Sequence, residues 1–538
     1  MMKKITKTIA ASLLLISGLL TSCDLTHEPS DLIPFRESFR TMEDLRKWDN
    51  GIYSTLRGKM GGAYVLPQEA QADMLNAHVS SRAYQSFHSW DLKATDETLN
   101  GIYQSYYAAL TDVNLVLAYA DQVEIPKGEE DRAKKMIAQY KGNAYFARAY
   151  YYFNLAIRWG MPYVEETAAT DLCVPHPLEM KPLELLPRAT NKVVWDRILD
   201  DLHKAEELLA GTIAVEGNKE LSQDLVIALR ARVLYYMNRP AEALAAAERL
   251  ISKRTYPLIA PLKESDPRPN ETPIENDPFV QMWQRDSGKE QIWQPFIEKP
   301  HELTNAISLY GADLSTQQHQ ENERKRIEPF NAPNFLPTVE MLALFDSKDR
   351  RANAYFEFVY TSVQSPDNIF GYIAVISKFK GNPALRDRDS KVWGGYVPNG
   401  IQAPKPFRIA EQYLIAAESA YDTQDEDKAK TFLNDLRLSR GLEATEATGE
   451  ELQKLIREER ARELAFEGFR LWDLRKWGNG FTRGRPQSDS GRNSTDFIQK
   501  EYGLGLEIKA RHDFFIWGFP GDEVQSINPN LKQNPGWK

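Results

Sequence analysis

The residue patterns that usually mark an enzyme are incomplete in this sequence. His301-Glu302 begins the HExxH pattern of zinc peptidases, but Asn305 stands where the second histidine is needed. Gly288-Lys289 is followed by Glu290, whereas a phosphate-binding loop needs Ser or Thr at that position. The eight histidines are scattered, and two cysteines are too few for a zinc finger or a disulfide framework. These patterns therefore give no support to an enzyme without excluding one, and we expect no catalytic residues, no metal and no cofactor.

A second candidate for chemistry is a densely charged stretch at residues 451–477. Arginines and glutamates alternate there with apolar residues, at the three- and four-residue spacings of one helix. The arginines could form an anion site. The alternative is that Arg–Glu pairs tie the helix to its neighbours, and we favour it because buried arginines usually pair with carboxylates. The charged residues are Arg457, Glu458, Glu459, Arg460, Arg462, Glu463 and Glu467.

The composition limits the class of protein. The chain has 538 residues, 42% of them hydrophobic, so a folded body of two or three structural units is expected. Its net charge of −9 argues against nucleic-acid binding. The 11 Trp and 24 Tyr residues exceed what a core of this size needs, which favours a surface that stacks flat ligands.

The N-terminus has the features of a lipoprotein signal peptide. Lys3, Lys4 and Lys7 precede an apolar run at residues 9–20, which is short for a membrane span. Leu20-Thr21-Ser22-Cys23 follows, with small residues just before the cysteine. Cleavage after residue 22 would leave Cys23 as the site of lipid attachment, and an ordinary secretory signal with a chance cysteine is the alternative. We expect an exported body that a lipid anchor holds to a membrane.

Helical periodicity dominates the rest of the chain. Apolar residues recur on one helix face in residues 41–56, 100–120, 132–159 and 191–210. Residues 221–252 read as two helices around the turn Asn238-Arg239-Pro240, with small residues at Ala228, Ala231, Ala241 and Ala245 where the helices should approach. Residues 407–438 repeat this pattern. Two such pairs favour tetratricopeptide-like units over generic helical hairpins.

Residues 255–405 are different, because prolines are dense and helical periodicity fades. Short strands are expected at residues 291–296 and 372–379. The predicted fold class is mainly α, with a tetratricopeptide-like helical repeat scaffold and a loop-rich, irregular ligand-facing region. The predicted divisions are a signal peptide at 1–22, an N-terminal helical region at 23–255, a variable loop-rich region at 256–405 and a C-terminal region at 406–538.

Several long motifs, in order, resemble the SusD/RagB family of Bacteroidetes outer-membrane lipoproteins. They cover nearly the whole chain after the signal peptide. The stretches are Arg408-Ile409-Ala410-Glu411 with its continuation to Glu418, Asn434-Asp435-Leu436-Arg437 with Arg440-Gly441, the charged stretch 451–477, and the ending from Gly518-Phe519-Pro520 to Trp537. The N-terminal half matches more loosely, through Ala147-Arg148-Ala149-Tyr150 and Gly160-Met161-Pro162-Tyr163.

The resemblance implies a non-enzymatic protein that is lipid-anchored to the cell outer membrane and faces the exterior. It implies capture of oligosaccharides, which would pass to a partner TonB-dependent outer-membrane transporter of the SusC-like type. Peptide capture by the same scaffold, a scaffold with protein partners only, and a lipid-anchored hydrolase remain alternatives. The shared motifs themselves are expected to be architectural.

Candidate ligand-binding residues lie outside those motifs. Sugar rings stack on Trp and Tyr, and their hydroxyls need polar side chains at the ring edge. Residues 76–90 combine both types with little helical periodicity, and family members often bind through the corresponding region. Packing of these aromatic residues onto the scaffold is the alternative. The predicted ligand-binding residues are Arg82, Tyr84 and Trp90, with Tyr310 and Trp393 in the loop-rich region.

The lipid-anchor prediction can be tested in cells that lack the partner transporter. Replacing Cys23 by Ala removes the thiol that lipid attachment requires, so the Cys23→Ala protein should move from the outer-membrane fraction to a soluble fraction. Fractionation and immunoblotting measure this. Continued membrane retention of the variant would contradict lipidation at Cys23.

Overall fold

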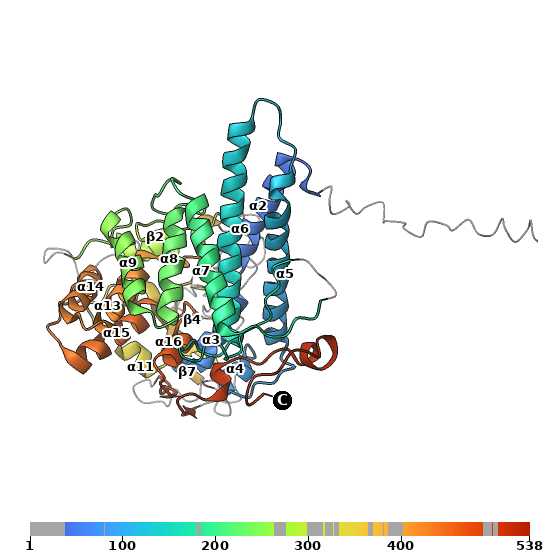
Figure 1. Ribbon diagram of the computed structural model, residues 1–538. Helices are drawn as coiled ribbons and strands as arrows, with labels where there is room; N and C mark the ends of the chain where they lie inside the picture. Colours follow the sequence, from blue (N-terminus) through green and yellow to red (C-terminus); the bar gives the residue numbers. More distant parts are fainter. Residues whose placement is uncertain are drawn as a thin grey trace, which may run out of the picture.

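The structure is a computed structural model, and Figure 1 shows its helical character. It describes residues 38–79, 81–179, 184–262, 276–297, 316–317, 326–327, 333–363, 369–379, 381–385, 402–487, 498 and 504–537. Cys23, Tyr310 and Trp393 lie outside these residues. Helices dominate the described chain, as the sequence predicted, and helix pairs stack beside one another in the manner of a tetratricopeptide-like scaffold.

Three N-terminal helices form the tallest part of the molecule. They are α2 (Met42–Gly58), α5 (Glu97–Tyr119) and α6 (Glu130–Trp159). Figure 1 shows α5 and α6 as a long antiparallel pair that projects beyond the other helices. The Thr41 hydroxyl accepts from the Asp44 amide and the Asp44 carboxylate accepts from the Thr41 amide, so a capping box starts α2. In its last ten residues α6 is buried on every side, which explains its aromatic sequence.

The remaining long helices pack as neighbouring pairs. The helices α7 (Asn191–Leu208), α8 (Gln223–Tyr236), α9 (Pro240–Lys253), α13 (Ile409–Asp422) and α14 (Glu426–Ser439) follow in chain order. Both predicted hairpins, α8–α9 and α13–α14, are present, and α13 also packs against α9. Ala228 and Ala231 are buried as expected, but Ala241 and Ala245 are exposed. Ala243 and Ala247 are buried in α9 instead, because the α9 face is shifted by two residues from the predicted one.

The charged stretch 451–477 is not the single helix that the sequence predicted. It forms α15 (Gly449–Glu463) and α16 (Arg470–Lys476), and the chain between them turns through left-handed backbone at Phe466 (φ 65°) and Gly468 (φ 87°). The turn brings the Gly468 amide to 2.5 Å from a carboxylate oxygen of the buried Glu69. A tertiary contact therefore ends the helix where local periodicity would continue it.

Short elements connect these helices to the loop-rich region. The strand β1 (Leu75–Ala77) pairs antiparallel with β5 (Phe335–Pro337), and β2 (Gln291–Trp293) pairs antiparallel with β8 (Phe407–Arg408). A four-stranded sheet has the order β3-β4-β6-β7, in which β4 runs parallel to β6. Its strands are β3 (Thr316–Gln317), β4 (Arg326–Ile327), β6 (Phe356–Val363) and β7 (Ile369–Ile376). The predicted strands at 291–296 and 372–379 thus overlap β2 and β7.

Other short elements complete the described chain. They are η2 (Gly62–Tyr64), α3 (Leu66–Gln71), α4 (Gln85–Ser89), η3 (Ala120–Gln122), α10 (Pro278–Gln284), α11 (Val339–Ala343), α12 (Arg351–Tyr355), η7 (Pro383–Leu385), β9 (Phe481–Thr482), β10 (Glu507–Ile508), η10 (Asp513–Phe515) and η11 (Glu523–Ile527). The four boundaries proposed from the sequence remain a prediction.

The Glu463 carboxylate, at the end of α15, is the centre of a buried ion network. It accepts from Arg408 at 2.5 Å, from Arg440 at 2.9 and 3.0 Å, and from Arg351 at 3.0 Å. All four side chains are at most 1% exposed. The arginines belong to β8, to the end of α14 and to α12, so one carboxylate joins four elements.

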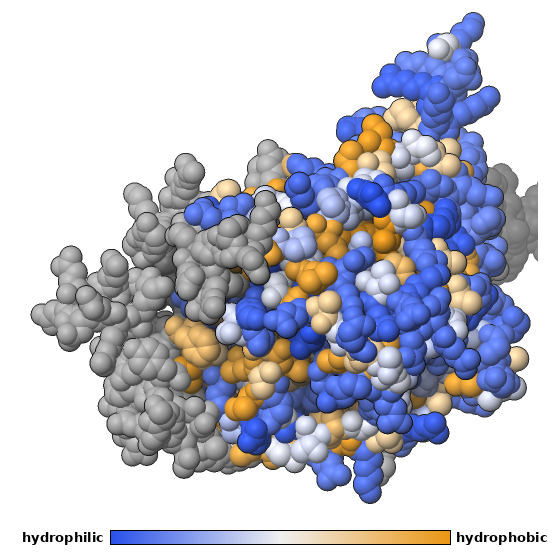
Figure 2. Space-filling model, turned by 90° about the vertical axis from the view of Figure 1, so that its left-hand side faces the viewer, coloured by the Kyte–Doolittle hydropathy of each residue, from blue (hydrophilic) through white to orange (hydrophobic). Residues whose placement is uncertain are grey.

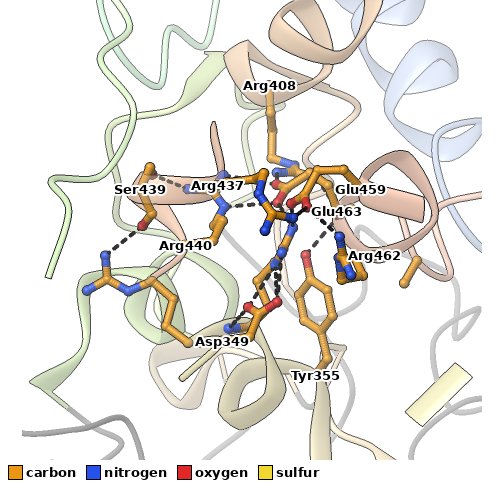
Figure 3. Close-up of polar contacts among 12 residues, drawn as sticks. Asp349, Tyr355, Arg408, Arg437, Ser439, Arg440, Glu459, Arg462 and Glu463 are labelled. Atoms are coloured by element: carbon orange, nitrogen blue, oxygen red, sulfur yellow. Dashed lines mark hydrogen bonds and ion pairs between the residues drawn. The ribbon is translucent and has the colours of Figure 1, made fainter. Parts of the chain in front are cut away.

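Further carboxylates balance the positive charge of those arginines. Figure 3 shows Glu459 and Glu463 facing arginines from several chain segments. The additional pairs are Arg440–Glu290 (2.6 Å), Arg351–Glu459 (2.7 Å), Arg351–Asp349 (2.7 Å), Arg462–Glu459 (2.7 Å) and Arg408–Glu467 (2.5 Å). The prediction that Arg–Glu pairs tie this stretch to its neighbours is confirmed. Burial alone would raise the pKa of Glu463, but the charges of Arg440 and Arg408 outweigh it and hold that pKa well below its usual range.

The C-terminal residues form a strap around the end of α6. The Trp517 amide donates to the Arg158 carbonyl at 2.7 Å, and the Trp159 indole donates to the Gly518 carbonyl at 2.8 Å. Asn534 closes the strap, because its side-chain amide donates to the carbonyls of both Trp159 and Trp517 at 2.8 Å. The asparagine-rich ending is therefore architectural.

The surface is largely hydrophilic where Figure 2 shows it, with smaller hydrophobic patches between charged residues. That face is the left-hand side of Figure 1, where α9, α13 and α14 lie. Among the described residues, none of the helices combines the length and the apolar character that crossing a membrane requires.

The ion network predicts a large loss of stability when its centre is neutralised. Glu463→Gln keeps the shape of the side chain but leaves three arginines without their shared anion, and breaking a buried pair costs about 3–5 kcal/mol. The control is Glu242→Gln, which removes an exposed partner of Arg239 and should cost less than about 1 kcal/mol. Chemical denaturation measures both. Equal effects of the two substitutions would contradict a structural role for the network.

The same network should make stability depend on pH in one direction. The pKa of Glu463 is lowered in the folded state, so its contribution is present above the unfolded carboxylate pKa of about 4.3 and is lost on acidification. We expect the difference in unfolding free energy between wild type and Glu463→Gln to be constant above about pH 5 and to shrink below about pH 4. Denaturation curves at several pH values test this, and a difference that grows in acid would refute it.

Candidate functional site

The predicted ligand-binding stretch 76–90 is only partly open to solvent. Arg82 is exposed, and its guanidinium donates to the Ser81 carbonyl at 2.8 Å. Tyr84 is half-buried, with its ring edge against Phe87, and burial raises the pKa of its hydroxyl to about 12. Its hydroxyl therefore stays a hydrogen-bond donor at neutral pH. Binding of ligand by Arg82 and Tyr84 stays a prediction.

Trp90 does not present the open ring face that the sequence suggested. It is 7% exposed, and its indole donates to the Gln71 carbonyl at 2.7 Å. The rings of Phe481, His512 and Phe515 surround it at 5.1–5.8 Å. Because these partners come from the C-terminal 60 residues, a local reading of the loop could not reveal them. Trp90 therefore packs inside the fold and does not offer the expected exposed platform, and binding of ligand by Trp90 stays a prediction.

A cavity lies between the N-terminal helices and the C-terminal region. Its walls are the end of α2, the η2 turn, α3, the last turns of α6, α8, residues 402–406 and the break between α15 and α16. Its volume is about 120 Å³, against roughly 10–15 Å³ for one water molecule. The cavity is therefore well above the minimum size that admits one water molecule. The walls include the aromatic rings of Tyr64, Tyr150, Phe153, Phe466, Phe469 and Trp472.

Three residues of these walls also have a buried polar atom without a hydrogen bond. The Gln68 amide donates to the Tyr64 carbonyl at 2.8 Å, which leaves its Oε1 unbonded. The Oε1 of Gln402 and the Nε of Arg158 are likewise buried without a hydrogen bond. All three side chains are at most 2% exposed. These atoms are closed off from the cavity space, and similar atoms occur elsewhere in the described chain, so they do not by themselves mark a ligand site.

Two buried cations belong to the same walls. Lys59 is 5% exposed, and its ammonium donates to the hydroxyls of Tyr64 (3.3 Å) and Ser105 (2.5 Å). Burial lowers the pKa of Lys59 to about 8, against the opposing effect of the more distant Asp112. Arg158 donates to the Asn154 side chain at 2.7 Å and to the Tyr64 carbonyl at 2.7 Å.

Sequence reasoning missed this cavity because its residues are scattered. Lys59, Gln68, Arg158 and Gln402 come from four distant segments, and none belongs to a recognisable motif. One signal was available: Arg158 lies on the same helical face as Tyr150, Asn154 and Ile157, within an otherwise apolar stretch. A charge on a buried face needs a partner, which points to a special environment.

The described residues do not form a metal site. In the part of the chain that the structure describes, no group of three or more His, Cys, Asp or Glu side chains could hold a metal ion. Cys173 is free and buried, and burial raises the pKa of its thiol to about 12, so it is not a nucleophile at neutral pH.

Comparison with known protein families gives a match in the N-terminal part and another in the C-terminal part of the chain. Residues 384–537 match the model described as "SusD family", and residues 31–234 match a SusD-like model described as "Starch-binding associating with outer membrane". A similar protein is SusD-like protein P38 of Formosa agariphila, which is 22% identical over 516 residues that cover 88% of this chain and 92% of the relative.

Solved structures have the same fold. A SusD superfamily protein from Bacteroides thetaiotaomicron superposes with a TM-score of 0.71 at 20% identity, over 92% of this chain and all of the other. A laminarin-binding SusD-like protein superposes with a TM-score of 0.65 at 18% identity, over 93% and 100% of the two chains. The two family models together span most of the scaffold described above, and the chain belongs to the SusD family.

Proposed function

We propose that this protein captures oligosaccharides at the outer membrane and passes them to a TonB-dependent transporter. The observation that carries the proposal is the cavity between the N-terminal helices and the C-terminal region, whose walls combine aromatic rings with polar side chains. Aromatic rings suit the flat C–H faces of a pyranose, and mixed donors and acceptors suit its hydroxyls. Membership of a family with a laminarin-binding relative supports the same ligand class.

Transfer to a transporter is the finer part of the proposal. A lipid at Cys23 would hold the protein at the membrane surface, where tethering raises its effective concentration near any membrane partner. Capture and transfer of a ligand require no catalytic step, which agrees with the incomplete catalytic motifs in the sequence. A partner transporter would co-purify with this protein after mild detergent extraction.

A binding screen tests the ligand class directly. The soluble protein without residues 1–23 is titrated by calorimetry with neutral oligosaccharides, acidic oligosaccharides and short peptides. Binding of oligosaccharides but not of peptides is the expected result. Binding of peptides alone would reject glycan capture and favour the peptide-binding form of the same scaffold.

Blocking the cavity should abolish binding without unfolding the protein. Gly61 lines the cavity in extended backbone (φ −158°), and a Cβ added there meets no atom within 4 Å. Gly61→Leu should therefore weaken binding at least tenfold while the melting temperature changes little. The matched control is Gly101→Leu, on the exposed side of α5, where a Cβ also meets no atom within 4 Å. Unchanged affinity of Gly61→Leu would move the binding site away from this cavity.

A further inference from the structure

The walls of the cavity are mainly apolar. Between the aromatic rings named above lie aliphatic and thioether side chains and two prolines. These residues are Met60, Val65, Leu66, Ile157, Pro404 and Pro406. Met60, Leu66 and Ile157 are buried, and they come from the chain after α2, from α3 and from α6. A ligand group that enters this space therefore meets mostly carbon atoms.

Many polar side chains of the same walls are already bonded to other protein groups. The Asn154 side-chain amide donates to the Tyr150 carbonyl at 2.8 Å, and its oxygen accepts from Arg158 at 2.7 Å. The Tyr236 hydroxyl donates to the Asp473 carboxylate at 2.9 Å. A hydroxyl-rich ligand inside the cavity would therefore find few partners, and burying hydroxyls without partners is unfavourable.

Most of the charge in the walls is balanced within the protein. The ion pairs are Arg232–Glu411 (2.6 Å), Lys405–Asp286 (2.8 Å), Lys378–Glu467 (2.8 Å) and Arg408–Glu467 (2.5 Å). Lys59 and Arg158 bond to hydroxyls, to an amide oxygen and to backbone carbonyls instead. The charges therefore favour a neutral group in the cavity over an ionised one.

The size of the cavity suits one flat ring. Its volume is about 120 Å³, and an apolar cavity of about 150 Å³ is enough to bind benzene. A pyranose ring carries hydroxyl groups on most of its carbons, which add volume and need hydrogen-bond partners. An aryl ring uses the same space without that requirement, and it packs well against aromatic walls.

Sugar units attached to such a ring would lie at the rim of the cavity. Tyr64, Val65 and Phe469 line the cavity and are partly exposed, and so is Glu467. Both hydrogen bonds of the Glu467 carboxylate to cations use Oε1, which leaves Oε2 as an acceptor for a sugar hydroxyl. The rim thus combines rings with a polar group, whereas the interior is mainly apolar.

We infer that the cavity takes up an aryl group that is joined to a sugar, as in a phenolic ester or an aryl glycoside of an oligosaccharide. The inference rests on the proposed function and names the class of oligosaccharide within it. The aryl ring lies among the aromatic and aliphatic walls, and the sugar lies at the rim. Burial of the ring and its contacts with other rings supply most of the affinity.

The decisive experiment compares glycosides that differ only in the group on one oxygen. The soluble protein without residues 1–23 is titrated by calorimetry with the phenyl and methyl glycosides of glucose, galactose and xylose, and with phenol. The phenyl member of at least one pair should bind ten times or more tighter than its methyl partner. The heat-capacity change should be more negative for that phenyl glycoside, because its binding buries more apolar surface.

A variant tests whether the aryl ring enters this cavity. Ile157→Phe adds atoms to the buried wall on α6, so it should remove the phenyl preference without lowering the melting temperature, because the added atoms fill empty space. The matched control is Ile137→Phe, in a buried position of the same helix away from the cavity lining. It should lower the melting temperature by overpacking and leave the preference unchanged.

A second filling variant covers the case in which Ile157→Phe does not fold. Met60→Phe fills the cavity from the chain after α2 and should remove the phenyl preference in the same way. A folded filling variant that keeps the full preference would place the aryl group elsewhere and overturn the inference.

The titrations also separate this inference from the proposed function. Oligosaccharide binding with no phenyl preference in any pair would overturn the inference and leave glycan capture standing. Phenol that binds as tightly as the phenyl glycosides would show a site for free aromatic molecules and also overturn it. Peptide binding without binding of any sugar or glycoside would reject both the inference and the proposed function.

Discussion

The buried carboxylate of Glu463 is the interaction on which much of the C-terminal region depends. Taking a charge out of water is costly, and three arginines offset that cost only when their own geometry is fixed. Because these arginines come from α12, β8 and the end of α14, the position of one side chain determines how four elements pack. The loop that begins three residues after Glu463 forms one wall of the cavity. The ion network therefore also positions part of the candidate site.

Much of the scaffold could be predicted from local sequence. The helices follow from apolar residues at helical spacing, and α2, α5, α6 and α7 lie within a few residues of the predicted ranges. The alternation of arginine and glutamate correctly indicated a structural network. Local signals were enough here because each depends on residues that are near in sequence or on charges that cannot be buried alone.

The features that the sequence did not predict depend on contacts between distant segments of the chain. Gly468, in left-handed backbone, is a local signal for the break after α15, but the buried Glu69 of α3 that holds its amide could not be seen in the local sequence. Trp90 looked like an exposed aromatic residue because the rings that cover it come from residues 481–515. The cavity could not be predicted for the same reason, because the side chains that line it come from distant segments and belong to no single motif.

The assembly of the cavity has a consequence for the order of folding. Glu69 and Gly468, which join its two sides, are 399 positions apart in the chain. Contacts at such separations form late, because the entropy of closing a long loop must be lost before the contact stabilises anything. Until the last quarter of the chain arrives, the aromatic wall on α6 faces water. A newly made chain therefore passes through a stage in which one wall of the cavity exists but the cavity itself does not. During that stage the same aromatic residues are exposed to unwanted association rather than available for ligand.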